Sequence, residues 1–129
     1  MTEKNSLSEK DRNEILNLLN GVAYILDARE YDRLGEVFAA DMHFENPGRL
    51  KADGLSAVTE SFRTIKDPAL SFHITNVIIA PNGDGTARAM SKALTMRSDK
   101  SFAPAQYTDV VKKTPAGWRI ASRTVKPLP

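Results

Sequence analysis

The sequence predicts an α+β fold, with helices in the first half of the chain and antiparallel strands in the second. Apolar residues recur at helical spacing over residues 9–28. From residue 70 onward the pattern changes to the alternation typical of strands. Clusters of turn-forming residues at 81–85 and 114–117 separate these strands. Helices followed by strands joined through hairpins are the arrangement of an α+β domain.

Length and composition indicate one folded domain. The chain has 129 residues, of which 41% are hydrophobic and 26% charged. A domain of this size buries about two-thirds of the surface of its unfolded chain, enough for a core and a modest cavity. We expect a single domain over residues 1–129, with residues 1–8 and 126–129 as flexible tails.

Charge and residue types narrow the partners. The net charge of +2 is small and the basic residues are scattered, so we expect no nucleic-acid partner. The chain has no cysteine and only two histidines, which excludes thiolate sites and a three-histidine zinc site. A mixed carboxylate site stays formally open, but we expect neither a metal nor another cofactor. No apolar leader or membrane-length run is present, so we expect a cytoplasmic protein without membrane contacts.

Three helices are expected on one face of the sheet. Capping-box spacing at Ser6 and Ser8 starts the first helix, and Asp53 or Ser56 starts the third, which ends before Pro68. A short second helix lies between them. The apolar residues that define the first two helices are Ile15, Leu18, Leu19, Val22, Ala23 and Leu26, then Tyr31, Leu34, Val37 and Phe38.

The strands are expected to curve around a pocket. A short strand at 41–45 leads to a turn and a polar loop at 48–53. The four later strands are expected at 70–80, 86–97, 102–113 and 118–125. Strands of such length twist and curl. Three helices on one face would therefore close a cone with a pocket between helices and sheet.

His73 is the first candidate for chemistry. It lies in the middle of the hydrophobic run 70–80, and strict alternation places it on one face with Thr75 and Val77. An imidazole with an ordinary pKa of ~6.5 suits proton transfer near neutral pH. The alternative is a core histidine whose ring is satisfied by a backbone carbonyl.

Four short strings, in their order and spacing, make the chain similar to a known superfamily. The strings are AREYDRL at 28–34, VFAAD at 37–41, HITNV at 73–77 and GWRI at 117–120. With them the chain resembles the SnoaL-like branch of the nuclear-transport-factor-2-like (NTF2-like) superfamily over nearly its whole length. The resemblance implies an NTF2-like cone, but it does not settle function, since the superfamily holds dehydratases, isomerases, cyclases, dioxygenase small subunits and non-enzymatic binding modules.

Two families in the superfamily imply site residues. Similarity to scytalone dehydratase implies that Asp27 and His73 form a catalytic acid–base pair facing one cavity. Similarity to ketosteroid isomerase places its general base at Asn46, which cannot act as a base, and its oxyanion-hole aspartate at Asp109. By sequence alone, the more common role for Asp27 is a solvated charge at a helix end or a cap for the next helix.

The remaining candidates would line the pocket. Tyr24 lies three residues before Asp27, so one helix face can present both. Asp109 is either a cavity group or the ion-pair partner of Arg123 or Arg119. For the aromatic and apolar candidates, core packing is the alternative to ligand contact. The expected substrate-binding residues are Tyr24, Phe44, Asn46, Phe62, Met90, Tyr107 and Asp109.

These observations lead to one functional hypothesis and two alternatives. We expect a protein that binds a small apolar or aromatic molecule, polyketide- or steroid-like. It would act on that molecule as a lyase or isomerase (dehydratase, isomerase or cyclase) by proton transfer between Asp27 and His73. The alternatives are a ligand-binding module without turnover and a dimeric scaffold with a vestigial pocket. We also expect a homodimer.

Overall fold

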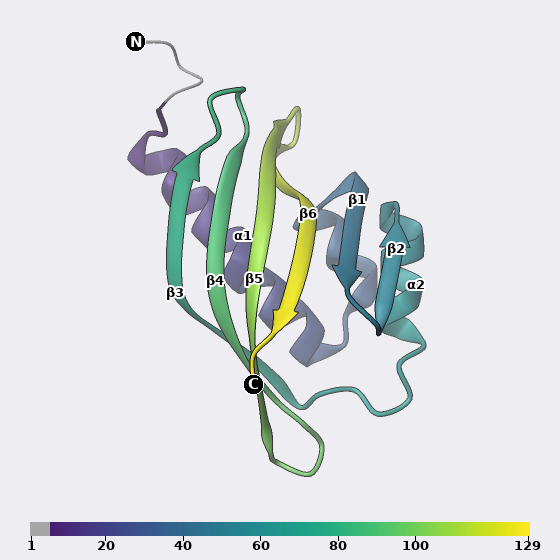
Figure 1. Cartoon of the computed structure of the whole chain (residues 1–129). Helices are drawn as coiled ribbons and strands as arrows, with labels where there is room; N and C mark the ends of the chain where they lie inside the picture. Colours follow the sequence, from purple (N-terminus) through teal and green to yellow (C-terminus); the bar gives the residue numbers. More distant parts are fainter. Residues whose placement is uncertain (1–5) are drawn as a thin grey trace.

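The computed structural model describes residues 6–129 as helices packed on one twisted sheet (Figure 1). The strands follow one another across the sheet in the order β2-β1-β6-β5-β4-β3. The elements, in chain order, are α1 (Glu9–Ala28), η2 (Tyr31–Glu36), β1 (Phe38–Asn46), β2 (Leu50–Asp53), α2 (Leu55–Arg63), β3 (Ser71–Pro81), β4 (Ala87–Met96), β5 (Phe102–Thr114) and β6 (Gly117–Pro127).

Helix α1 crosses behind the sheet and supplies much of the core (Figure 1). The Ser8 side chain accepts a hydrogen bond from the backbone N–H of Asp11, while the Asp11 carboxylate accepts one from the backbone N–H of Ser8. This reciprocal capping box satisfies two of the backbone donors that a helix start leaves unpaired. The helix ends at Ala28, and the capping residue after it, Arg29, has a φ of 58° in the left-handed region. Ser8 is therefore part of a helix cap; residues 1–5 of the predicted N-terminal tail lie outside the described residues.

The sheet is antiparallel except at one pair of strands. β3, β4, β5 and β6 form successive antiparallel neighbours, and β1 pairs in parallel with β6. The predicted α+β class and the mostly antiparallel, curved sheet are confirmed. The prediction of three N-terminal helices holds only in part, because α2 follows both β1 and β2, whereas one strand, at 41–45, was expected before this helix.

The chain between η2 and α2 differs from the expectation. The second helix is a 3-10 helix that ends at Glu36, so Phe38 belongs to β1. Residues 50–53, expected as a loop, form β2 and pair with β1. Neither Asp53 nor Ser56 caps α2, since the residue before that helix is Gly54 with a φ of 91°.

A bulge at Asn76 changes which side chains of β3 face the core. Asn76 has a φ of 54°, and the pairing with β4 shifts between Thr75 and Ile78. An extra residue in one strand reverses the alternation beyond it. Phe72 and Ile74 therefore pack on the core together with Val77 and Ile79. Strict alternation along 70–80, as predicted, is wrong at this point.

The end of the chain is part of the sheet. β6 extends to Pro127, and the backbone N–H of Leu128 donates to the carbonyl of Pro104 at 3.0 Å. The prediction of a flexible tail over 126–129 is therefore wrong for its first three residues. This hydrogen bond continues the pairing of β5 with β6 past its last strand pair, Ala105 with Pro127.

Candidate functional site

A buried ion pair lies on the helix-facing side of the sheet. Arg123 of β6 and Asp109 of β5 are direct cross-strand neighbours, with 3% and 0% of their surfaces exposed. Arg123 donates from Nε to Asp109 Oδ1 at 2.8 Å and from Nη2 to Oδ2 at 2.9 Å. Burial disfavours the charge of Arg123, but the charge and hydrogen bonds of Asp109 outweigh it and raise the pKa of the guanidinium. Of the alternatives predicted for Asp109, the structure confirms the ion pair with Arg123.

Tyr107 lies beside this pair on the same face of β5. The guanidinium carbon of Arg123 stands 4.4 Å from the centre of the Tyr107 ring, a cation–π contact. Burial raises the pKa of the Tyr107 phenol, against smaller lowering effects from the Arg123 charge and the Thr95 hydroxyl. The phenol therefore keeps its proton near neutral pH, and its hydroxyl interacts with that of Thr95.

Two buried oxygens near these residues have no hydrogen-bond partner among residues 6–129. They are Oγ of Ser91 and Oδ1 of Asn46. Ser91 of β4 is 2% exposed and pairs directly with Tyr107. Asn46 lies two residues beyond Phe44, the β1 partner of Arg123, and so shares its face. Buried polar atoms are normally paired, so two unpaired oxygens around one cluster indicate a place where a polar ligand atom or water is accommodated.

The wall beside this cluster is built from small side chains. From Ala87 to Ala93, the side chains of β4 that face the helices are those of alanines and Ser91. Ala93 pairs with Ala105 of β5. Large side chains stand on the opposite wall, where the rings of Phe44 and Phe62 meet edge to face with centroids 5.3 Å apart. One side of the interior is therefore lined by small side chains and the other by aromatic rings.

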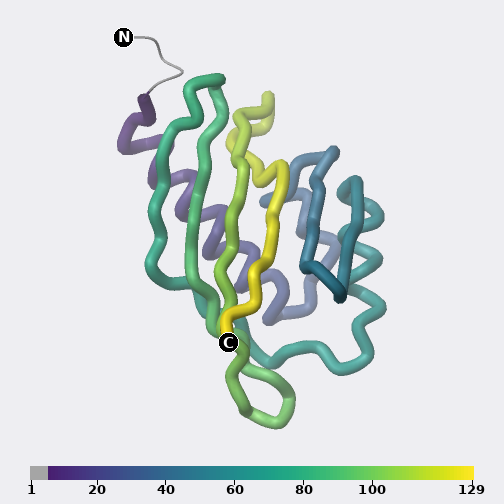
Figure 2. Tube along the Cα trace, viewed as in Figure 1, coloured from purple at the N-terminus to yellow at the C-terminus, as the bar shows by residue number. Residues whose placement is uncertain are grey.

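A small pocket lies at the end of the molecule where α1 ends. It has a volume of about 30 Å³. Figure 2 shows the segment 64–70 passing this end of the molecule on its way from α2 to β3. Phe72, in its wall, pairs with Thr95, whose hydroxyl interacts with Tyr107. The opening is lined by Leu26, Tyr31, Phe62, Ile65, Pro68, Ala69 and Phe72.

The structure does not bring the predicted catalytic pair together. Asp27 is exposed at the end of α1, and its Oδ1 accepts a hydrogen bond from the backbone N–H of Phe72 at 2.9 Å. His73 is exposed on the outer face of the sheet, where its Nε2 bonds to the Ser71 hydroxyl at 2.9 Å. The prediction that both side chains face one cavity is therefore wrong, because Phe72 rather than His73 points inward.

The other predicted pocket residues divide between the interior and the surface. Phe44, Asn46, Phe62, Tyr107 and Asp109 all lie on the inner side. Two of the predicted pocket residues, Met90 and Tyr24, do not lie on the inner side. Met90 lies on the outer face of β4, paired with Ile78 and Thr108, and Tyr24 is 78% exposed.

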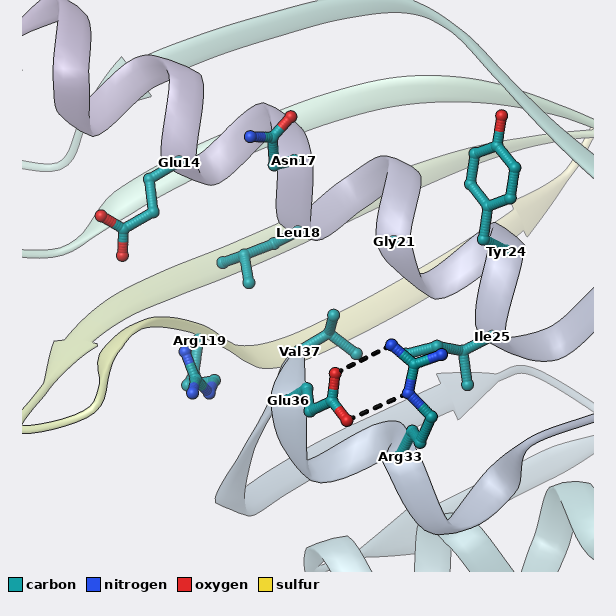
Figure 3. A pocket seen from close by; sticks show the side chains of 10 residues that line it. All are labelled: Glu14, Asn17, Leu18, Gly21, Tyr24, Ile25, Arg33, Glu36, Val37 and Arg119. Carbon is teal, nitrogen blue, oxygen red and sulfur yellow. Dashed lines mark hydrogen bonds and ion pairs between the residues drawn. The ribbon is translucent and has the colours of Figure 1, made fainter.

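Tyr24 instead borders an open groove between α1 and η2 (Figure 3). The groove has a volume of about 300 Å³. Its charged side chains are engaged within the protein: Arg33 pairs with Glu36, and Glu14 accepts from the backbone N–H of Trp118 at 2.7 Å. Arg119 likewise donates to backbone carbonyls. Few polar groups are left for a ligand, so the cone interior is the stronger candidate site.

Ser91, Tyr31 and Phe72 were not among the predicted site residues, and Arg123 was named only as an ion-pair partner. A signal for Arg123 exists, since it lies in alternation with Val125 on an inward face. No such signal exists for Ser91, because a serine between alanines is equally typical of an exposed strand. No group of metal-ligating side chains suited to a metal ion occurs in the described residues. Nor does that part of the chain contain a helix with the length and hydrophobicity needed to span a membrane.

Comparisons with known proteins agree with this architecture. No protein with curated functional information matches the chain in sequence. An NTF2-like protein with a cystatin-like fold from Novosphingobium aromaticivorans is 21% identical, with a TM-score of 0.82 over 92% of this chain and 82% of that one. A protein of unknown function with a cystatin-like fold from Nostoc punctiforme is also 21% identical, with a TM-score of 0.84 over 96% of each chain. A proposed scytalone dehydratase from N. aromaticivorans is 20% identical, with a TM-score of 0.76 over 100% of this chain and 89% of that one.

These structures share the fold with this chain: an NTF2-like, cystatin-like α+β arrangement in which helices pack on a curved six-stranded sheet. The model of the SnoaL-like domain matches residues 8–124, which include Ser91, Tyr107, Asp109 and Arg123. The chain therefore belongs to the SnoaL-like domain family.

Proposed function

We propose that the protein binds a small apolar or aromatic molecule inside the cone, entering between Tyr31, Phe62 and Phe72. The observation that carries this proposal is the unpaired, buried hydroxyl of Ser91 next to Tyr107. An oxygen of this kind costs stability in an apolar core, about 1–3 kcal/mol, unless something pairs with it. A ligand with an oxygen at one end and an apolar ring would satisfy both the polar cluster and the aromatic wall.

Entry requires movement of the rings at the opening. A space of about 30 Å³ holds no more than a water-sized group. Phe72 is half-buried and the segment 64–70 beside it is largely exposed. Rotation of these rings would extend the opening toward Thr95 and Tyr107.

A matched pair of substitutions on β5 tests the location. Ala105 faces the interior and Gln106 faces outward, so Ala105→Leu narrows the interior while Gln106→Leu adds a similar side chain outside. With ethylbenzene and acetophenone as probes, ligand-observed NMR should show binding to the wild type and to Gln106→Leu. Ala105→Leu should bind at least tenfold more weakly. Equal binding by both variants would contradict an interior site.

A reaction of the isomerase or dehydratase type is the second candidate. Its supporting observation is Tyr107, a buried and neutral phenol that can donate a proton or a hydrogen bond to a substrate oxygen. Enolisation of acetophenone in D₂O exchanges its methyl protons, which NMR records directly. Faster exchange with the wild type than with Tyr107→Phe would support turnover. Exchange with the wild type at the same rate as in buffer alone would indicate that the protein binds acetophenone without catalysing this reaction.

A further inference from the structure

We propose that Arg123 donates a hydrogen bond to an oxygen of the ligand, and that the preferred ligands are uncharged aromatic carbonyl or phenolic compounds. This inference rests on the proposed function, since it names the chemistry of the same interior site. It starts from a nitrogen that the ion pair leaves unused.

The guanidinium of Arg123 has donors to spare. Nε and Nη2 each donate to one oxygen of Asp109. Among the described residues, the side-chain hydrogen bonds of Arg123 are those of Nε and Nη2, and 4% of its side chain is exposed. A guanidinium carries five N–H donors in a fixed plane, so two N–H groups of Nη1 remain available.

The orientation of this nitrogen is fixed. The Asp109 carboxylate accepts two hydrogen bonds from the opposite edge of the guanidinium, a bidentate arrangement that aligns the planes of the two groups. The Tyr107 ring covers one face of it. A donor held in this way loses little conformational entropy when a ligand binds.

The surroundings supply the rest of a polar subsite. Ser91 pairs with Tyr107 across the sheet, and Asn46 shares its face with the β1 residue next to Arg123. Both contribute unpaired oxygens in the described structure. A carbonyl or phenol oxygen can accept from Nη1, and a phenol hydroxyl or a bridging water can donate to Ser91 or Asn46.

Charge selects against anionic ligands. Asp109 already neutralises Arg123, so the pair as a whole has no net charge. A carboxylate ligand would bring an uncompensated negative charge into an interior where desolvation is costly. An uncharged oxygen avoids that cost and still receives a hydrogen bond from a charged donor.

Three probes of similar shape test the inference: ethylbenzene, acetophenone and benzoate. We expect the wild type to bind acetophenone about tenfold more tightly than ethylbenzene, the effect of one hydrogen bond to a charged donor. Benzoate should bind more weakly than acetophenone. In the double variant Arg123→Met with Asp109→Leu, the ratio of the acetophenone and ethylbenzene dissociation constants should fall to about one. Replacing both partners avoids an unpaired buried carboxylate.

Each outcome decides between the claims. Equal affinities of wild type for acetophenone and ethylbenzene, a preference for benzoate, or an unchanged ratio in the double variant would overturn the role of Arg123 while interior binding stands. Absence of binding by all three probes would overturn both proposals.

A second measurement needs no variant, should the double variant fail to fold. The side-chain ¹⁵N–¹H signals of Arg123 should shift downfield with acetophenone and not with ethylbenzene. Signals unaffected by acetophenone would overturn the inference.

Discussion

Asp109 and Arg123 are held in the core by each other. Two charges in an apolar interior are tolerated only when both are paired and hydrogen-bonded. Here the pair is bidentate, and Tyr107 adds a contact to the guanidinium face. The pair therefore creates a polar end inside the cone without a net charge, which is what an uncharged ligand with one oxygen requires.

Removing one partner of this pair should be far more harmful than removing both. We expect Arg123→Met to lower the free energy of unfolding by about 3–5 kcal/mol, because it leaves Asp109 buried and unpaired. Adding Asp109→Leu should restore most of the loss. Urea unfolding of the wild type, the single and the double variant measures both values. A double variant as unstable as the single one would contradict this account.

Protonation of His43 makes the stability of the sheet edge depend on pH. Its ring contacts Asp53 through Nδ1 and Glu45 through Nε2 on the outer face. The hydrogen bond with Asp53, followed by that with Glu45, raises the pKa of His43 above its ordinary ~6.5. The protonated ring is thus favoured in the folded state. Its stabilisation is complete below the unfolded-state pKa and is lost as pH rises through the higher folded-state pKa.

An NMR titration of His43 checks this effect. The midpoint should lie above ~6.5 in the wild type and move down in Asp53→Asn. The difference in unfolding free energy between the two proteins should be larger below pH ~6.5 than above the folded-state pKa. A midpoint that Asp53→Asn leaves unchanged would show that this carboxylate does not act on His43.

At the scale of elements, the bulge in β3 decides which side chains reach the interior. Asn76 is exposed and has a φ of 54°, a conformation that asparagine tolerates and β-branched residues resist. It keeps Phe72 and Ile74 on the same side as Val77 and Ile79. Without the bulge, one half of the strand would turn its apolar residues to solvent.

Substitutions at Asn76 separate backbone conformation from side-chain contacts. We expect Asn76→Val to lower the unfolding free energy by about 1–2 kcal/mol, because valine is strained at positive φ. Asn76→Gly should be nearly neutral, since glycine adopts this conformation readily. Urea unfolding measures both. A neutral Asn76→Val variant would indicate that the strand can lose the bulge without cost.

The elements show what the sequence could and could not reveal. Long periodic segments, such as α1 and the four later strands, were predictable because burial imposes a regular spacing on them. The bulge was not, since alternation alone carries no signal for one inserted residue. His73 was expected inside because of the similarity to scytalone dehydratase, and two largely apolar faces on 70–80 gave no sequence signal that Phe72 faces inward instead. The short β2 was missed because it depends on pairing with β1 rather than on its own composition.

The interior site was predictable in part for a similar reason. Tyr107 and Asp109 alternate with Val111, so their shared inward face follows from period two. Asp27 failed as a catalytic candidate because a helix-end carboxylate can bond to a backbone N–H as easily as to a histidine. Here the strand start at Phe72 was the nearer partner.

At the scale of the whole molecule, the outer face of the sheet is the candidate surface for self-association. It exposes Ile78, Leu94 and Phe102, which are 64%, 42% and 53% accessible. Exposed apolar side chains on neighbouring strands favour burial against a second surface. We propose a homodimer that packs these faces together and leaves the opening of each cone at its end accessible.

Size-exclusion chromatography with light scattering tests the dimer. We expect a mass twice that of the 14.2 kDa chain, and a monomer for Leu94→Lys. Tyr24→Lys provides the control, because it places the same charge on an exposed aromatic position away from this face. A wild-type protein that is monomeric both at high concentration and after 100-fold dilution would rule the dimer out.

The most direct test of the ligand site is a crystal structure of the protein with acetophenone. The account predicts the phenyl ring between Phe72 and the Phe44–Phe62 pair, with the carbonyl oxygen within hydrogen-bond distance of Arg123 Nη1. Acetophenone bound instead in the groove between α1 and η2, or on the outer face of the sheet, with the interior unchanged, would contradict it.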